Sequence, residues 1–181
     1  MTDKETISAS KFMSLVLRHK PAAAGITLDS NGWAQTTALI DGMNQAGHNI
    51  TLDNLKEIVL KNNKQRFKFS EDYGKIRANQ GHSIAVDVEM QERQPPDILY
   101  HGTATKFLGA IKNEGIIAKN RLHVHLSPDK ETAVTVGQRH GKPVVLTINA
   151  AKMHQDGIAF YLSDNGVWLT ATVPVKYIYN I

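Results

Sequence analysis

Hydrophobic positions in the first half of the chain recur at helical spacing in three segments and then begin to alternate with polar ones. The spacing predicts helices over residues 8–20, 35–47 and 51–63. The alternation over 66–78, around an Asp-Tyr-Gly turn, predicts a β-hairpin. Three short helices followed by a hairpin are typical of a winged helix, a fold that often binds nucleic acid.

Polar residues and proline mark the ends of these helices. Ser8 or Ser10 is the expected N-cap of the first helix, and Pro21 prevents much continuation beyond it. Thr51 or Asp53 is the expected N-cap of the third.

The second half mixes strands and helices. The pattern predicts helices over 107–115 and 129–141, and strands over 98–103, 121–127, 143–150, 159–164 and 167–181. Two of these strands end in polar residues, at Tyr100–Thr103 and at His125–Ser127. Binding and catalytic sites are often found at such strand ends.

An acidic stretch ending in Gln-Pro-Pro-Asp divides the two halves. Lys and Arg outnumber Asp and Glu in residues 11–77 and 100–181, whereas Asp and Glu predominate in residues 78–99. The sequence therefore predicts an α+β protein with an N-terminal lobe over 1–84, a linker over 85–97 and a C-terminal lobe over 98–181.

Composition narrows the class of protein further. The 181 residues include no Cys, which excludes disulfides and thiolate chemistry and fits a cytoplasmic protein. No apolar run approaches the length of a membrane span, and the polar N-terminus lacks the apolar centre of a signal peptide. The net charge of +4 is a mild bias towards polyanionic partners. We expect a monomer that does not bind membranes.

Arg-His pairs occur twice, each followed closely by Lys and Pro and each at a predicted helix end. The first pair is Arg18 and His19, and the second is Arg139 and His140. A cation stabilises a helix C-terminus by about 0.3–1 kcal/mol, which is enough to explain either pair alone. Their recurrence favours one anion site, since Arg binds phosphate in bidentate fashion and His can donate a proton.

Two further polar clusters allow more than one interpretation. The stretch 76–83, Ile-Arg-Ala-Asn-Gln-Gly-His-Ser, is either a turn or a ligand-binding loop. His101, His123 and His125 could ligate zinc, but they lack an acidic or Cys partner at ligand spacing. Neutral His side chains hydrogen-bonded in a cleft are the better interpretation, so we expect no metal.

Seven motifs in order resemble the RNA 2′-phosphotransferase family, whose members remove a splice-junction 2′-phosphate from tRNA. They are Leu-Val-Leu-Arg-His-Lys-Pro at 15–21, and the segments 28–33, 64–67, 76–83, 99–103, 123–127 and 136–146. The resemblance covers nearly the whole chain. It implies a winged-helix lobe followed by an ADP-ribosyltransferase-like mixed α/β lobe with a split β-sheet, which binds NAD.

The resemblance also implies a metal-free reaction in two steps. The RNA 2′-phosphate first displaces nicotinamide from NAD, which gives RNA with ADP-ribose on its 2′-phosphate. The adjacent ribose hydroxyl then attacks phosphorus and releases 2′-hydroxyl RNA and ADP-ribose 1″,2″-cyclic phosphate. By resemblance, the catalytic residues are Arg18, His19, Arg66 and Arg139, and the NAD-binding residues are His101, Gly102, Thr103, His125 and Ser127.

Two alternatives from other classes stay open. One is an ADP-ribosyltransferase that acts on another phosphate, a nucleic-acid end or a protein, for which Arg18, His19 and Arg66 would have no role. The other is a winged-helix nucleic-acid-binding module with a degenerate second lobe, which the intact His-Gly-Thr and His-Leu-Ser elements argue against.

Overall fold

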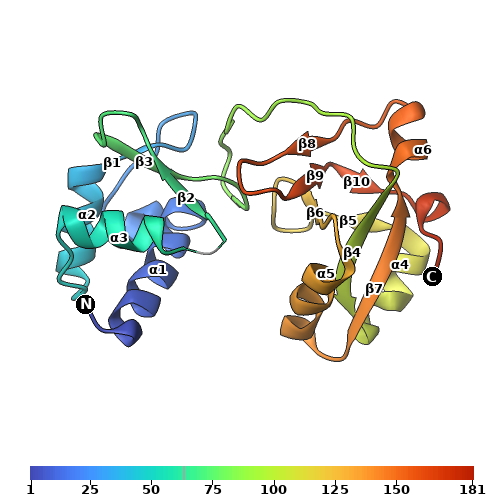
Figure 1. The fold of residues 1–181 in the computed structure, drawn as a ribbon, viewed down its shortest axis with the longest axis horizontal. Helices are drawn as coiled ribbons and strands as arrows, with labels where there is room; N and C mark the ends of the chain where they lie inside the picture. The colour runs from blue at the N-terminus through green and yellow to red at the C-terminus, as the bar shows by residue number, and fades with distance from the viewer. Residues whose placement is uncertain (63) are drawn as a thin grey trace. The chain divides into compact units, whose positions relative to one another are not determined.

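The computed structural model describes residues 1–62 and 64–181, and it divides into an N-terminal unit, Met1–Glu89, and a C-terminal unit, Met90–Ile181 (Figure 1). The boundary falls within 85–97, and the linker character of that range stays a prediction. Helices and several small sheets make this an α+β fold. No helix in the described part of the chain combines the length and the apolar character that crossing a membrane requires.

In its described residues, 1–62 and 64–89, the N-terminal unit contains three α-helices and one three-stranded antiparallel sheet with the strand order β1-β3-β2. Its elements are α1 Asp3–Arg18, η1 Pro21–Ala24, β1 Ala34–Gln35, α2 Thr36–Gln45, α3 Leu52–Leu60, β2 Phe67–Phe69 and β3 Lys75–Ala78. The predicted hairpin is confirmed, since β2 and β3 pair with Phe67 opposite Ala78. Assignment to the winged-helix fold stays a prediction. Residue 63, the end of the third predicted helix, lies outside the described residues.

The helix caps confirm one prediction and correct another. Thr51 caps α3, as expected, and forms a capping box with Asn54. The first helix begins at Asp3, so the expected caps Ser8 and Ser10 lie inside it. Thr2 accepts a hydrogen bond from the Glu5 backbone while the Glu5 carboxylate accepts one from Thr2, and this capping box lengthens α1 at its N-terminus.

One apolar core holds the N-terminal unit together. It includes Met13, Val16 and Leu17 from α1, packed with Leu39 from α2 and Leu55 from α3. Because these side chains fix α1 against the rest of the unit, the C-terminal end of α1 has a defined position. That end carries the first Arg-His pair.

The C-terminal unit is built from short strands and three α-helices. Its elements are β4 Ile98–Ala104, η2 Thr105–Phe107, α4 Leu108–Glu114, β5 Ile116–Ile117, β6 Val124–Leu126, α5 Lys130–Gly137, η3 Gln138–His140, β7 Pro143–Asn149, α6 Ala150–Gln155, β8 Tyr161–Leu162, β9 Trp168–Thr170, β10 Thr172–Val173 and η4 Val175–Tyr177. The single strand predicted over 167–181 is therefore wrong: the segment forms two short strands in different sheets, β9 and β10, and β10 ends at Val173. Pro174 lacks a backbone donor, and the chain turns into η4 after it.

The longest strand pair is β4 with β7, which run antiparallel side by side in Figure 1, with His101 opposite Leu146. β6 pairs with β9, and β9 pairs with β8. An isolated bridge between Tyr100 and Ser127 joins β4 to the end of β6. The two polar strand ends of the sequence analysis are thereby neighbours. The ADP-ribosyltransferase-like assignment of this unit stays a prediction.

Two glycines of the motifs allow α5 to pack directly against β4. A Cβ added at Gly102 would overlap the Ala133 carbonyl oxygen and lie 3.0 Å from the Gly137 nitrogen. A Cβ added at Gly137 would lie 2.6 Å from the Thr103 carbonyl oxygen. Backbone atoms of the helix and the strand are thus in contact, which fixes the position of Arg139 shortly after α5.

We expect Gly102→Ala to lower the free energy of unfolding of the C-terminal unit by about 1–3 kcal/mol or more, because the overlapping atoms are backbone. Gly109→Ala, in α4, is the matched control. Nothing lies within 4 Å of its added Cβ, so helix propensity predicts a gain of up to about 1 kcal/mol. Urea unfolding of full-length chains, monitored by Trp168 fluorescence in a Trp33→Phe background, measures both. Equal effects of the two substitutions would contradict the close packing.

Candidate functional site

The first Arg-His pair ends helix α1. Arg18 is its last residue and is only 8% exposed, and its guanidinium carbon lies 5.9 Å from the centre of the Phe67 ring. His19 is the C-cap, and its backbone N–H donates to the Leu15 carbonyl at 2.9 Å. The helix thus places both side chains at a fixed point beside the start of β2.

Arg66 directly precedes Phe67, so the chain brings it to the same edge of the N-terminal unit. Its guanidinium donates to the Asn62 side chain at 3.3 Å. The preceding residue, Gln65, has a φ of 41°, in the left-handed region that non-glycine residues seldom occupy. Asn79 holds this backbone in place by donating from its side chain to the Gln65 carbonyl at 2.6 Å and from its backbone to the Arg66 carbonyl at 2.9 Å.

The loop 79–83 binds the backbones of both arginines. Asn79 contacts Arg66, as described, and the Ser83 N–H donates to the Arg18 carbonyl at 3.0 Å. The Ser83 hydroxyl also lies 2.9 Å from Nδ1 of His19. The structure therefore gathers Arg18, His19 and Arg66, three of the four predicted catalytic residues, around one loop. Their catalytic roles stay predictions.

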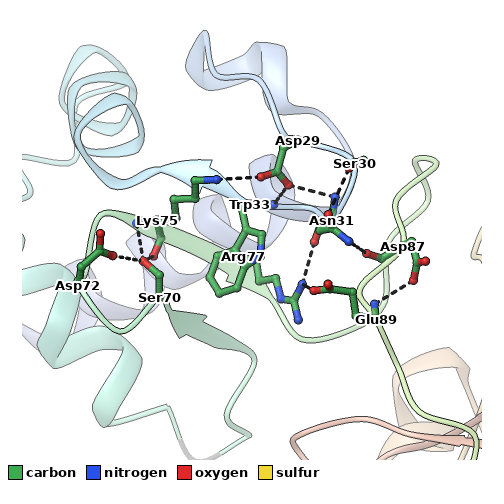
Figure 2. A network of polar contacts seen from close by, with 10 residues as sticks. All are labelled: Asp29, Ser30, Asn31, Trp33, Ser70, Asp72, Lys75, Arg77, Asp87 and Glu89. Atoms are coloured by element: carbon green, nitrogen blue, oxygen red, sulfur yellow. Dashed lines mark hydrogen bonds and ion pairs between the residues drawn. The ribbon is translucent and has the colours of Figure 1, made fainter.

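Three polar side chains of the stretch 76–83 point into the protein. Asn79 and His82 are buried, and Arg77 is only 5% exposed, with its guanidinium carbon 4.5 Å from the centre of the Trp33 ring. Figure 2 shows Arg77 reaching the Asn31 carbonyl and the Glu89 carboxylate, both at 3.1 Å. These contacts anchor Arg77 between two segments of its own unit, and whether the stretch 76–83 also binds a ligand stays a prediction.

His82 is held as a neutral imidazole. Burial, followed by the positive charges of Arg18, His19 and Arg77, lowers its pKa from 6.5 to about 4, against a hydrogen bond to the Leu17 backbone that favours the charged form. Below pH 6.5 the unfolded chain binds a proton at His82 that the folded chain does not bind until about pH 4. Stability contributed by neutral His82 is therefore complete above pH 6.5 and is lost as the pH falls towards 4.

Because of His82, we expect the free energy of unfolding of the N-terminal unit to fall by at most about 1.4 kcal/mol for each pH unit between pH 6.5 and 4. His82→Asn keeps a hydrogen-bond donor but does not titrate, so its stability should depend less steeply on pH. Urea unfolding at pH 7, 6 and 5, followed by Trp33 fluorescence in a Trp168→Phe background, gives the two slopes. Identical slopes would show that His82 is not the group responsible.

The residues that the resemblance assigns to NAD binding lie in the C-terminal unit. Nδ1 of His101 lies 3.0 Å from the His125 carbonyl oxygen, and Tyr100 and Ser127 exchange backbone hydrogen bonds of 2.9 and 2.7 Å. Desolvation lowers the pKa of His101; the His125 carbonyl opposes this shift and the nearby His140 adds to it. The structure thus brings His101 and Ser127 to adjoining strand ends, with the pKa of His101 lowered.

Arg139 lies in η3, which follows α5 directly, and it is exposed. Desolvation and then the positive charge of Arg139 lower the pKa of Arg121, which places a second guanidinium in its neighbourhood. The sequence analysis did not single out Arg121. The available signal was its position as the first residue of the strand predicted over 121–127, two residues before the motif at 123–127.

The histidines considered as zinc ligands make other contacts. His101 binds a backbone oxygen, and the His123 ring packs edge-on against Tyr161 with ring centres 5.8 Å apart. Within residues 1–62 and 64–181, no three His, Asp or Glu side chains form a group that could hold a metal ion.

Two comparisons with known proteins, one with family models and one with individual relatives, indicate the same family. A family model described as "RNA 2′-phosphotransferase, Tpt1 / KptA family" matches residues 4–172. A "Probable RNA 2′-phosphotransferase" of Acaryochloris marina is 50% identical over 179 residues, which cover 99% of each chain. A protein of the same name from Hahella chejuensis is 52% identical over 176 residues, covering 97% of this chain and 95% of the relative. The matched range includes every residue predicted for the site.

Proposed function

Since this chain belongs to the RNA 2′-phosphotransferase family, we propose that it removes internal 2′-phosphates from RNA with NAD as co-substrate. The observation that carries the proposal is the family match over residues 4–172, which includes Arg18, His19, Arg66 and Arg139. The gathering of the first three around the loop 79–83 supports it, because such a set of cations suits a phosphate dianion.

The residues of the C-terminal unit fit a dinucleotide. His101, Thr103 and Ser127 offer neutral hydrogen-bonding groups for ribose hydroxyls and the carboxamide, and Arg139 offers positive charge for the pyrophosphate. Packing also requires glycine at position 102, since any side chain there would collide with α5. When bound, NAD supplies an electrophilic ribose carbon, which an oxygen of the 2′-phosphate attacks as nicotinamide leaves.

The second step transfers the phosphoryl group away from the RNA. The neighbouring 2″-hydroxyl of the ADP-ribose forms a bond to phosphorus and loses its proton to solvent, while the bond between phosphorus and the RNA 2′-oxygen breaks. Arg18 and Arg66 stabilise the charge that builds up on the phosphoryl oxygens. His19 donates a proton to the departing 2′-oxygen and later regains one from solvent.

The proposal is tested with NAD and an oligonucleotide that carries one internal 2′-phosphate. We expect free nicotinamide, 2′-hydroxyl RNA and ADP-ribose 1″,2″-cyclic phosphate in equal amounts. The same oligonucleotide with a 2′-hydroxyl is the control for NAD hydrolysis, and one with only a terminal phosphate tests ADP-ribosylation of ends. Nicotinamide release without loss of the internal 2′-phosphate would favour the alternative ADP-ribosyltransferase function.

A further inference from the structure

We propose that Ser83 is a positioning residue: its hydroxyl accepts a hydrogen bond from Nδ1–H of His19, so that Nε2 is the nitrogen that exchanges a proton with the substrate. The part of this inference that concerns the reaction rests on the function proposed above. The contact itself does not depend on that function.

The geometry restrains His19 at two points. The last turn of α1 fixes its backbone through the bond from its N–H to the Leu15 carbonyl at 2.9 Å. Ser83, 64 residues further along the chain, fixes its ring through the 2.9 Å contact between Oγ and Nδ1. Ser83 also donates its backbone N–H to the Arg18 carbonyl at 3.0 Å, so that one residue binds two consecutive residues at the helix end.

Ser83 is exposed, yet the segment before it is firmly anchored. The buried side chain of His82 precedes it, and the Asn79 side chain is bound to the Gln65 carbonyl. Further back, Arg77 is held against Trp33 and by the contacts drawn in Figure 2. A hydroxyl in such a place can orient a ring, whereas a serine on a loose loop could not.

The chemistry of a proton donor indicates the direction of the hydrogen bond. A His that acts as general acid is an imidazolium, in which both ring nitrogens are donors, so Ser83 must accept from Nδ1. After Nε2 has given up its proton, the neutral ring keeps the Nδ1–H and the same bond. A hydroxyl therefore serves both states of the ring. Unlike a carboxylate, it does so without adding a negative charge that would raise the pKa of the acid.

The contact is tested in the full-length protein without substrate. Long-range 1H–15N correlation spectra report which nitrogen of each neutral imidazole carries the proton, and His19→Asn identifies the His19 signals by their loss. We expect the Nδ1–H form of His19 to predominate in the wild type and in Ser83→Thr, and its share to fall in Ser83→Ala. A predominant Nε2–H form in the wild type, or no change in Ser83→Ala, would overturn the inference even if the enzyme removes 2′-phosphates.

The role in the reaction is tested on the second step. We expect Ser83→Ala to slow it about 10- to 100-fold, the size of effect seen when the hydrogen-bond partner of a metal-binding His is removed. RNA affinity should stay unchanged, and Ser83→Thr should restore the rate. Ser14→Ala is the matched control, since that hydroxyl on α1 donates to the Ser10 carbonyl in its own helix. A Ser83→Ala rate equal to that of Ser14→Ala would refute the positioning role, while a wild-type protein inactive on 2′-phosphorylated RNA would refute the proposed function instead.

Discussion

Replacing Arg18 or Arg66 with alanine should make the protein accumulate RNA that carries ADP-ribose on its 2′-phosphate. Loss of one preorganised donor to a developing negative charge typically costs about 10²–10³ in rate. In the proposed reaction that charge is greatest when phosphorus is attacked and the RNA 2′-oxygen departs, whereas nicotinamide departure is proposed to depend on the C-terminal unit. The second step should therefore slow more than the first, and the intermediate should become visible.

Gel mobility of a labelled 2′-phosphorylated oligonucleotide, with NAD in excess, separates substrate, adduct and product over time. Lys11→Ala removes an exposed cation from the same helix and serves as the control. Because Arg18 is buried, circular dichroism must show that Arg18→Ala is folded. Arg18→Lys keeps the charge but loses the bidentate fork, so it too should accumulate adduct. Unreacted substrate without adduct in both alanine variants would assign these residues to binding or to the first step.

Local signals in the sequence predicted most of the secondary structure. The alternation of 66–78 identified the hairpin β2–β3, and Thr51 identified the start of α3. The early start of α1 also had a local signal, Thr2 followed by Glu5, which indicates a capping box. Pro174 in the last apolar stretch similarly argued against a continuous strand. The sequence could predict these features because each depends on residues that are close to one another in the chain.

The site itself depends on contacts between distant residues, which periodicity does not report. Ser83 contacts His19 across 64 residues, and Asn79, just after β3, donates to the carbonyls of Gln65 and Arg66. Composition showed that 76–83 was rich in polar groups but not that Arg77, Asn79 and His82 are buried. Likewise, Gly102 was visible as part of a motif, while its contact with α5 appears only in the folded chain. Motifs located the candidate residues, and packing shows which of them support the others.

His19→Ala should slow the second step by about 10²–10⁴, and a sulfur leaving group should restore much of that loss. A general acid contributes a factor of this size when it protonates a departing oxygen. An alkoxide is a strong base and leaves poorly without a proton, whereas a thiol has a pKa near 8.5 and leaves as a thiolate. An RNA whose 2′-phosphate is attached through sulfur therefore needs no acid at that atom.

The comparison pairs each protein with the oxygen-linked and the sulfur-linked substrate, and follows decay of the ADP-ribosylated RNA. For His19→Ala, we expect the rate with the sulfur-linked RNA to approach that of the wild type with the same substrate. Arg18→Ala should stay slow with both substrates, because its proposed role is to stabilise charge on the phosphoryl oxygens, which sulfur substitution leaves in place. Like His19→Ala, Ser83→Ala should regain a rate close to that of the wild type with the sulfur-linked RNA. A residue that positions a proton donor is not needed when the leaving group needs no proton. A His19→Ala variant that stays equally slow with both substrates would show that His19 contributes through binding or charge rather than as the acid.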